Sequence, residues 1–253
     1  MTDIFILACA AYFAGLVDAV VGGGGLIQVP ALFSVMPNVA PATLLGTNKL
    51  AGIWGTTVAA RNYAKAVKVR WAMVLPAAFT AFFLAFLGAF TVTHIPPTYL
   101  RKALPFILIA VAVYTFKKKD FGSNHAPTFA HNKELWMAML VGGGIGFYDG
   151  FFGPGTGSFL MFLFVRFFGY DFLSASAVAK IINVACNAAA LLWFGYSGHV
   201  IWQTGLAMAV CGVLGSLSGS RMAIKYGSGF VRKVFLVVVL VLICKTTYDG
   251  FIK

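Results

Sequence analysis

A Gly-rich tract that follows an aspartate inside an apolar stretch occurs twice in this chain at one fixed spacing. The first copy is centred on Asp18 and the second on Asp149, so the spacing is 149 − 18 = 131 residues. The same spacing relates Lys49 to Lys180. Charged residues are scarce here, which makes such coincidences in one register unlikely to arise by chance. The chain is therefore predicted to be duplicated, and duplication with interrupted apolar segments is typical of secondary transporters.

Composition places the chain in a membrane. Of its 253 residues, 60% are hydrophobic and 10% are charged, with a mean hydropathy of +0.88. A soluble domain has about 25% charged residues, so we expect an all-α polytopic membrane protein with the lipid bilayer as its partner. The 19 basic residues exceed the 7 acidic ones, but they sit in short clusters between apolar runs. That pattern is typical of cytoplasmic loops, and no nucleic-acid partner is predicted.

The lengths of the apolar stretches suggest hairpins that do not cross the bilayer. The stretches cover 4–21, 26–36, 42–60, 72–93, 103–116, 135–152, 157–169, 173–194, 202–220 and 234–251. The stretch 26–36 spans only about 16 Å as a helix, against a hydrocarbon core of about 30 Å. We therefore expect each short segment and the helix before it to form a re-entrant pair. The predicted organisation is a first repeat (1–116), a cytoplasmic linker loop (117–134) and a second repeat (135–253), within one membrane domain.

The basic loops indicate that the two repeats have opposite orientations. The loop 61–70 contains four basic residues, whereas its counterpart 192–201 contains no Lys or Arg. In the next pair of loops, 221–233 is the more basic and 94–102 has only Arg101 and Lys102. Because cytoplasmic loops are enriched in Lys and Arg, the bias predicts inverted-topology repeats, each with about three transmembrane helices besides its broken pair, or about eight spans in total. Full crossing by the first helix of each repeat is left open.

Four consecutive glycines interrupt the first apolar stretch, and a Gly-Thr-Gly-Ser run interrupts its counterpart. A glycine inside a helix costs about 1 kcal/mol relative to alanine, so we expect the chain to unwind at both places beside a cavity. The helix that restarts would present free N–H groups and its positive dipole end to an anion. The predicted substrate-binding residues of these tracts are Gly22, Gly23, Gly24, Gly25, Gly155, Thr156, Gly157 and Ser158. Alanine at positions 23 and 24 should let the helix continue and block transport. The rival interpretation is that the glycines only permit tight packing.

Lys49 and Lys180 are predicted to lie at membrane depth and to bind the same anion. A lysine there costs about 2.5–3.5 kcal/mol on insertion scales, so it should face a cavity or a partner. A structural ion pair with Asp18 or Asp149 is left open. Both roles are compatible if a passing anion or proton releases the lysine.

Asp18 and Asp149 are predicted as coupling residues, because burial favours the neutral form of a carboxyl group and so prepares it to carry a proton. They are equally compatible with holding the glycine break by accepting backbone hydrogen bonds. Asn48 and Asn183 are predicted to contact the substrate, and Asn187 is a further candidate. No metal site, cofactor or Ser-His-Asp set is recognised, and the absence of a nucleotide-binding motif excludes ATP drive within this chain. An enzyme is not predicted.

These motifs resemble those of the sulfite exporter TauE/SafE family of permeases. The matching residues of the first half are Gly15, Asp18, Gly22, Gly23, Gly24, Gly25, Pro30, Thr47, Asn48 and Lys49. Those of the second half are Gly146, Asp149, Gly153, Gly155, Thr156, Gly157, Ser158 and Lys180. Pro30 has Met161 as its counterpart, so the two halves are not interchangeable.

The resemblance implies a multi-pass transporter of the bacterial inner membrane that exports small sulfur-containing anions. We expect a secondary transporter of sulfite, a sulfonate or sulfoacetate that works by alternating access around a site at the membrane midplane. The alternatives are a passive anion channel and a proton- or cation-coupled importer of another small organic anion. Whether the chain forms a homodimer is left open.

Overall fold

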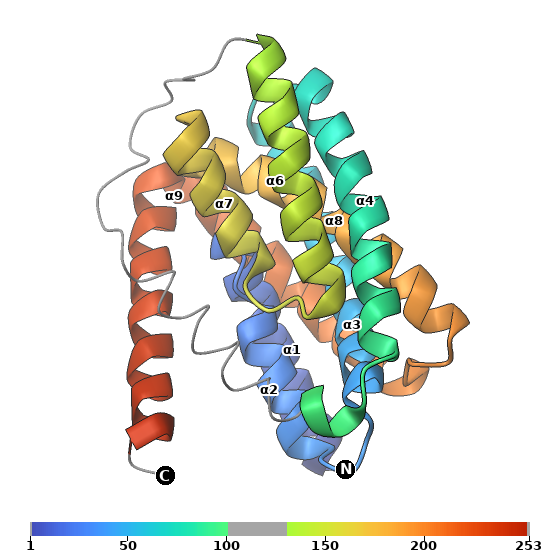
Figure 1. Ribbon diagram of the computed structural model, residues 1–253. Coiled ribbons are helices and arrows are strands. Elements are labelled where there is room, and N and C mark those ends of the chain that lie inside the picture. Colours follow the sequence, from blue (N-terminus) through green and yellow to red (C-terminus); the bar gives the residue numbers. More distant parts are fainter. Residues whose placement is uncertain (1, 101–130, 252–253) are drawn as a thin grey trace.

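The computed structural model describes residues 2–100 and 131–251, and within these ranges it contains helices and no strand. The helices are α1 (Thr2–Val21), α2 (Gly25–Val35), α3 (Pro41–Ala66), α4 (Trp71–Thr93), α6 (His131–Phe151), α7 (Thr156–Phe168), α8 (Phe172–Tyr196) and α9 (Trp202–Phe251). Figure 1 shows their arrangement. Helices satisfy their own backbone hydrogen bonds, as an apolar environment requires, and the predicted all-helical class is confirmed. The predicted stretch 103–116 and most of the linker lie outside the described residues.

The helix starts follow the spacing seen in the sequence. Helices α2, α3 and α4 begin at residues 25, 41 and 71, and α7, α8 and α9 begin at 156, 172 and 202, which is 131 residues later in each case. In Figure 1, α1 begins at the lower end of the molecule and α6 begins at its upper end. Helix α9 covers both predicted stretches 202–220 and 234–251, and its backbone leaves helical geometry at Gly227.

Several helices are long and apolar enough to cross a membrane. Within the described residues, four qualify by length and composition: Asp3–Val21, Trp71–Thr93, Phe172–Tyr196 and Trp202–Val231. Two shorter apolar helices are Gly25–Val35 and Thr156–Phe168. At about 1.5 Å per residue, the 11 residues of α2 cover about 16 Å. The chain is thus an integral membrane protein, and its short segments have the predicted lengths.

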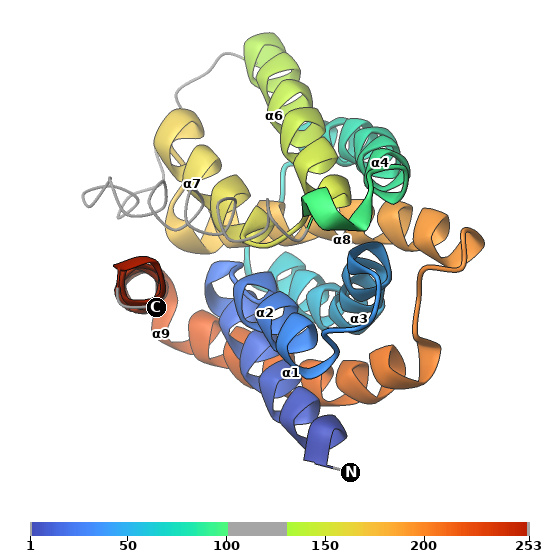
Figure 2. The same cartoon turned by 60° about the horizontal axis from the view of Figure 1, so that its bottom comes forward.

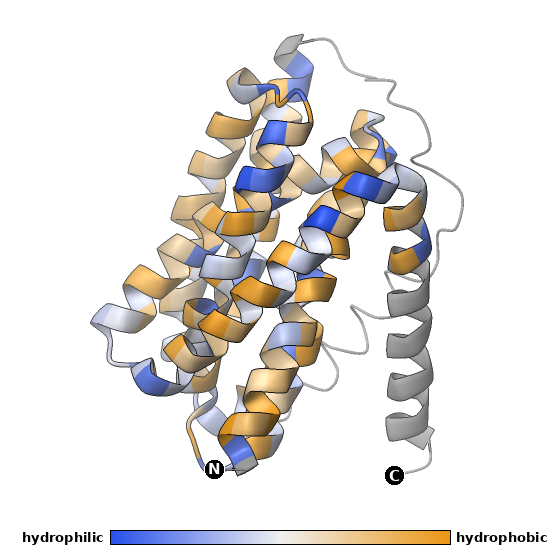
Figure 3. Cartoon of the chain, turned by 180° about the vertical axis from the view of Figure 1, so that it is seen from behind, coloured by the Kyte–Doolittle hydropathy of each residue, from blue (hydrophilic) through white to orange (hydrophobic). Residues whose placement is uncertain are grey.

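The outer surface is apolar along the helices. Figure 3 shows hydrophobic residues over the sides of the molecule. Large apolar side chains that are exposed include Phe79 and Phe83 of α4, Leu140 of α6 and Leu214 of α9. Exposed apolar side chains on several helices suit contact with lipid.

The helices form two bundles, and each bundle contains three helices of one sequence half and one helix of the other half. The first bundle contains α1, α2, α3 and α9, and the second contains α4, α6, α7 and α8. Figure 2 shows the second bundle above the first, with α8 and α3 facing each other between them. Helix α4 belongs to the first half of the sequence yet packs on α6 and α8, while α9 belongs to the second half and packs on α1 and α3. Neither bundle is therefore built from one half alone.

Equivalent small residues bring helices close together in both bundles. A Cβ on Gly219 of α9 would clash with the carbonyl group of Leu16, and a Cβ on Gly88 of α4 would clash with that of Phe147. The 131-residue spacing relates the two glycines to each other (88 + 131 = 219) and the two residues that they contact to each other (16 + 131 = 147). Glycine lets backbones approach closely at such crossings in membranes. The same close contact thus occurs twice, between α1 and α9 and between α6 and α4.

Asp171 forms the N-cap of α8. Its Oδ1 accepts hydrogen bonds from the Leu173 amide (2.9 Å) and the Ser174 amide (3.1 Å), and Ser228 Oγ donates to the same atom at 2.8 Å. Burial alone would raise the pKa of this carboxyl group, but the hydrogen bonds outweigh it and hold the pKa below its ordinary value. The cap satisfies amide groups that a helix start leaves without partners.

The first turn of α6 connects to the loops before α4 and α8. Glu134, assigned to the linker by its polar surroundings in the sequence, lies within α6 and is buried. Its Oε1 accepts hydrogen bonds from Arg70 Nη1 (2.9 Å) and from the Tyr170 hydroxyl (3.0 Å). Because these partners offset the cost of burying a carboxylate, the helix extends further towards the linker than the sequence indicated.

Candidate functional site

The chain unwinds at both glycine tracts, as the sequence predicted. Helix α1 ends at Val21 and α2 begins at Gly25, while α6 ends at Phe151 and α7 begins at Thr156. The first break turns at Gly22 (φ 80°) and the second at Gly153 (φ 95°), which are equivalent positions. Only glycine adopts this left-handed region without strain. The tracts are therefore needed for a change of chain direction, and packing alone does not account for them.

The two breaks lie against each other between the bundles. The Ser158 amide donates to Gly22 O at 3.1 Å, and Ser158 Oγ donates to Val21 O at 2.8 Å. The start of α7 thus satisfies carbonyl groups at the end of α1. Ser158, predicted to bind the substrate, is occupied by this contact.

Other amide groups at the breaks remain available to a ligand. Among the described residues, no acceptor takes the amide hydrogens of Gly24, Gly25, Gly155 or Gly157. All four glycines line the same cavity. Free amides at helix starts favour anions, so this part of the predicted arrangement is present.

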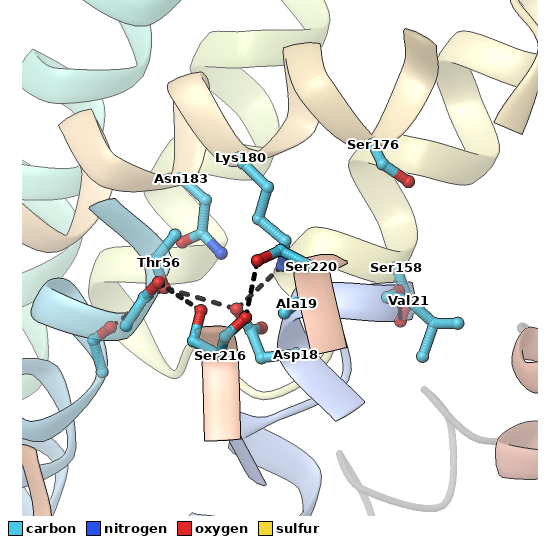
Figure 4. A network of polar contacts seen from close by, with 12 residues as sticks. Asp18, Ala19, Val21, Thr56, Ser158, Ser176, Lys180, Asn183, Ser216 and Ser220 are labelled. Atoms are coloured by element: carbon cyan, nitrogen blue, oxygen red, sulfur yellow. Dashed lines mark hydrogen bonds and ion pairs between the residues drawn. The ribbon is translucent and has the colours of Figure 1, made fainter. Parts of the chain in front are cut away.

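The two lysines form ion pairs that cross from one bundle to the other. Lys49 Nζ of α3 lies 2.5 Å from Asp149 Oδ2 of α6, and Lys180 Nζ of α8 lies 2.8 Å from Asp18 Oδ2 of α1. The second pair is drawn in Figure 4. Each pair maps onto the other by the 131-residue spacing, because 49 + 131 = 180 and 149 − 131 = 18. The ion pairs left open by the sequence are therefore present, and each joins a lysine of one half to an aspartate of the other.

The two pairs have different surroundings. The side chains of Lys49 and Asp149 are 3% and 2% exposed, whereas those of Lys180 and Asp18 are 2% and 18% exposed. Thr56 Oγ1 of α3 also lies 3.3 Å from Asp18 Oδ2, as Figure 4 shows. Asp18 is thus the more exposed of the two carboxylates.

A cavity of about 50 Å³ lies between the bundles. Its wall includes the following predicted residues: Asp18, Gly22, Gly24, Gly25, Asn48, Lys49, Asp149, Gly155, Thr156, Gly157 and Asn183. Gly23, Ser158 and Lys180 do not line it, and Lys180 reaches it only through Asp18. One buried water needs about 10–15 Å³ of such volume, so the cavity has room for a few water molecules or for a small solute of similar size.

Polar side chains that sequence reasoning missed complete the wall. Gln28 of α2 and Thr56 of α3 line the cavity together with Asn187 of α8, a further candidate from the sequence. Thr56 is the counterpart of Asn187, because 56 + 131 = 187, and this match could have revealed it. Gln28 has an apolar counterpart, and its only signal is that it is polar in a short apolar segment.

Asn48 brings a buried carbonyl group to this region. The residue is 8% exposed, and within the described chain its Oδ1 has no hydrogen-bond partner. Asn183 differs, because its Oδ1 accepts from Asn187 Nδ2 at 3.1 Å. A buried polar atom without a partner costs about 1–3 kcal/mol, which favours the binding of a further group. Within the described residues, no cluster of three His, Cys, Asp or Glu side chains could hold a metal ion.

Comparison with known proteins identifies relatives along nearly the whole chain. The family model described as sulfite exporter TauE/SafE matches residues 7–246. A "Probable membrane transporter protein ORF9" of Sinorhizobium sp is 37% identical, covering 96% of this chain and 92% of the relative. The "Probable membrane transporter protein YfcA" of Escherichia coli K12 is 35% identical, covering 97% of this chain and 90% of the relative. A "Probable membrane transporter protein" of Haemophilus influenzae is 32% identical, covering 96% and 94%. No solved structure matches significantly.

Proposed function

Because this chain belongs to the sulfite exporter TauE/SafE family of membrane transporters, we propose that it exports a small sulfur-containing anion such as sulfite, a sulfonate or sulfoacetate. The anion binds in the cavity between the bundles, where amide groups of both glycine breaks and the ammonium groups of Lys49 and Lys180 are its partners. Transport proceeds by alternating access around this site. The bacterial origin of the relatives supports the inner membrane as its location.

The crossed ion pairs are the observation that carries this proposal. Both pairs connect the two bundles beside the cavity. An anion that replaces Asp18 beside Lys180 would become the charge partner of that lysine and remove one contact between the bundles. Removing the partner of a buried charge is otherwise costly, by about 3–5 kcal/mol. Substrate binding and bundle separation are thereby linked.

The moving bodies in this mechanism are the bundles. Helices α4 and α9 each pack with helices of the opposite half, so the moving bodies are not the two sequence repeats. The described contacts between the bundles are made mainly by α3 with α8, with smaller contributions from α8 with α9 and α1 with α7. Rocking of one bundle on the other along this contact would open the cavity to alternate sides.

An inverted repeat accounts for both the charge pattern and the helix directions. The helices of the two halves start at equivalent residues, and α1 and α6 begin at opposite ends of the molecule in Figure 1. The basic loops alternate in the way that the positive-inside rule expects for opposite orientations. In this topology about eight segments cross or enter the bilayer, and the linker 117–134 is cytoplasmic.

A proton- or cation-coupled importer is the rival that a specific observation favours. Among the described residues, the cavity wall carries two carboxylates, Asp18 and Asp149, and one lysine, Lys49. With both ion pairs intact, the charges of the two lysines and two aspartates sum to zero. The net charge of the site therefore does not favour the binding of an anion alone. An anion gains from this site only when a carboxylate is neutralised or displaced.

Transport by purified protein in liposomes tests the proposal. Binding would first be screened by thermal shift with sulfite, sulfoacetate, taurine and carboxylates that lack sulfur. A bound anion should then show saturable uptake and counterflow, which a passive channel does not produce. Lys49→Ala should abolish binding, while Lys65→Ala, at an exposed lysine of the same helix, should leave it intact. Counterflow that responds only to anions without sulfur would contradict the proposed substrate class.

A further inference from the structure

We infer that Asp18 is the residue that takes up the coupling proton, whereas Asp149 keeps its pairing with Lys49 as a fixed connection between the bundles. This inference rests on the proposed function, since it assigns the co-substrate of that same cavity. It separates two residues that the sequence treats as equivalent.

Access to water distinguishes the two carboxylates. Asp18 is 18% exposed and lines the cavity, while its partner Lys180 is buried behind it. Asp149 is as deeply buried as Lys49, although both residues line the cavity. A proton arriving with the cavity water therefore meets the Asp18 carboxylate first. In the Lys49–Asp149 pair, the ammonium nitrogen already lies 2.5 Å from the carboxylate oxygen Oδ2.

Thr56 gives Asp18 a partner in both protonation states. Its hydroxyl lies 3.3 Å from Asp18 Oδ2 and 3.0 Å from Gly52 O. A hydroxyl group both donates and accepts, so it donates to the ionised carboxylate and accepts from the protonated one while its own hydrogen bonds to Gly52 O. The equivalent residue of the other half, Asn187, directs its Nδ2 to Asn183 Oδ1. Asp149 has no such hydroxyl at the corresponding place.

The other helices packed against α1 add few ionisable groups near Asp18. Helix α8 contributes Lys180, and α3 contributes Tyr63, whose hydroxyl donates to Ala19 O at 2.8 Å. Lys49 and Asp149 line the same cavity as Asp18. Within the described side chains, the other basic residues of α3, α7 and α9 are exposed: Arg61, Lys65, Arg166, Arg221, Lys225 and Lys233. Asp3, Cys9 and Tyr12 are the remaining titratable groups of α1 and lie one or more turns away. Lys180 is therefore the charge that responds most directly to protonation of Asp18.

The charges balance through a complete cycle. A proton from cavity water binds Asp18, and the sum over the two lysines and two aspartates changes from zero to +1. The Lys180 ammonium group then lacks its counter-charge, and a monovalent anion that enters the cavity restores the sum to zero. Proton and anion therefore bind cooperatively, with the proton first, and they move together without net charge. The Lys180–Asp18 contact between the bundles is released, and the Lys49–Asp149 contact persists.

Infrared difference spectroscopy on the full chain in lipid nanodiscs tests this assignment. The chain has only seven acidic residues, so the carbonyl band of a protonated carboxyl group can be assigned by variants. Acidification should produce a band that Asp18→Asn removes and Asp149→Asn retains. A band that persists in Asp18→Asn, or that disappears in Asp149→Asn, overturns the inference.

A second variant keeps the test valid if Asp18→Asn fails to fold. Thr56→Val removes the hydroxyl beside Asp18 with little change in volume, and should shift the frequency of the band. Thr57→Val is the matched control, because Thr57 is exposed and its hydroxyl bonds to Ile53 O of its own helix. Equal bands in wild type, Thr56→Val and Thr57→Val would place the proton elsewhere.

Anion addition separates this inference from the proposed function. Sulfite, sulfoacetate and ethanesulfonate would be added in turn to wild type in weakly buffered solution. Binding of fully ionised ethanesulfonate should take up about one proton per anion, and Asp18→Asn should bind it without proton uptake. If no anion binds but the Asp18 band is present, the proton site stands and anion transport fails. If anions bind without change in the band, anion transport stands and coupling at Asp18 fails.

Discussion

Alanine at Gly22 and at Gly23 should have very different effects, although the two residues are neighbours in one tract. Gly22 has a φ of 80°, and a Cβ there would clash with the backbone of Gly157 and lie 2.5 Å from the Ser158 amide nitrogen. These are backbone atoms, which no rotamer change can move away. A Cβ on Gly23 would have its nearest neighbour at 3.6 Å, which is ordinary contact, and its φ lies outside the left-handed region.

The cost of Gly22→Ala can be built from its parts. A left-handed conformation costs an alanine about 1–2 kcal/mol. Relief of the clash separates the two breaks and weakens the two hydrogen bonds that Ser158 donates to Gly22 O and Val21 O, each worth about 1 kcal/mol. The expected loss is about 3–4 kcal/mol in the free energy of unfolding. For Gly23→Ala, which meets neither obstacle, we expect a change below about 1 kcal/mol.

Unfolding by sodium dodecyl sulfate in mixed micelles, followed by tryptophan fluorescence, measures both variants on one scale. Gly23→Ala serves as the matched control, since it makes the same chemical change one residue away. Equal losses in the two variants would refute the reasoning, because they would show that the number of glycines, rather than the left-handed turn and the contact between the breaks, determines stability.

Three further predictions use the same measurement. Lys49→Met should cost about 3–5 kcal/mol because it leaves a buried carboxylate without its partner, and adding Asp149→Leu should recover most of that loss; a double variant no more stable than the single one would contradict a buried pair. Gly219→Ala and Gly88→Ala should each cost about 1–3 kcal/mol by overpacking equivalent helix crossings, and an effect in only one of them would show that the crossings are not equivalent. Asp171→Ala should cost about 1 kcal/mol through loss of an N-cap. Because the pKa of Asp171 is lowered, its contribution is present above the ordinary value of 3.8 and disappears as the pH falls through the folded-state pKa, so a difference from wild type that persists in strong acid would argue against this origin.

The helices and the breaks were predictable because their causes are local. Apolar length, charge scarcity and the Gly22 and Gly153 tracts act within a few residues, and the structure places the starts of the described helices within a few positions of the expected ones. The expectation that alanine at positions 23 and 24 lets the helix continue and blocks transport stays a prediction. The structure shows that Gly23 has room for a Cβ, whereas a Cβ on Gly24 would lie 2.6 Å from Asp18 Cβ.

The pairing of lysines with aspartates could not be predicted, because it depends on which helices become neighbours. The 131-residue spacing showed that Lys49 and Lys180 are equivalent. It does not tell whether each lysine pairs with the aspartate of its own half or with the aspartate of the other half. The outcome is decided by small residues such as Gly88 and Gly219, which bring α4 to α6 and α9 to α1. Thr56 beside Asp18 is likewise a contact between helices, and no sequence pattern near Asp18 indicates it.

The exchange of α4 and α9 between the bundles has a consequence for how the protein is made. When the ribosome has released only the first half, α4 has no α6 to pack on and α1 has no α9, so neither bundle can be completed during that stage of synthesis. Assembly must wait for the later helices, and a nascent first half depends on lipid or an insertion factor to cover its small-residue faces. Two half-length chains made from separate genes would already contain the helix surfaces described here, and could assemble them without a linker.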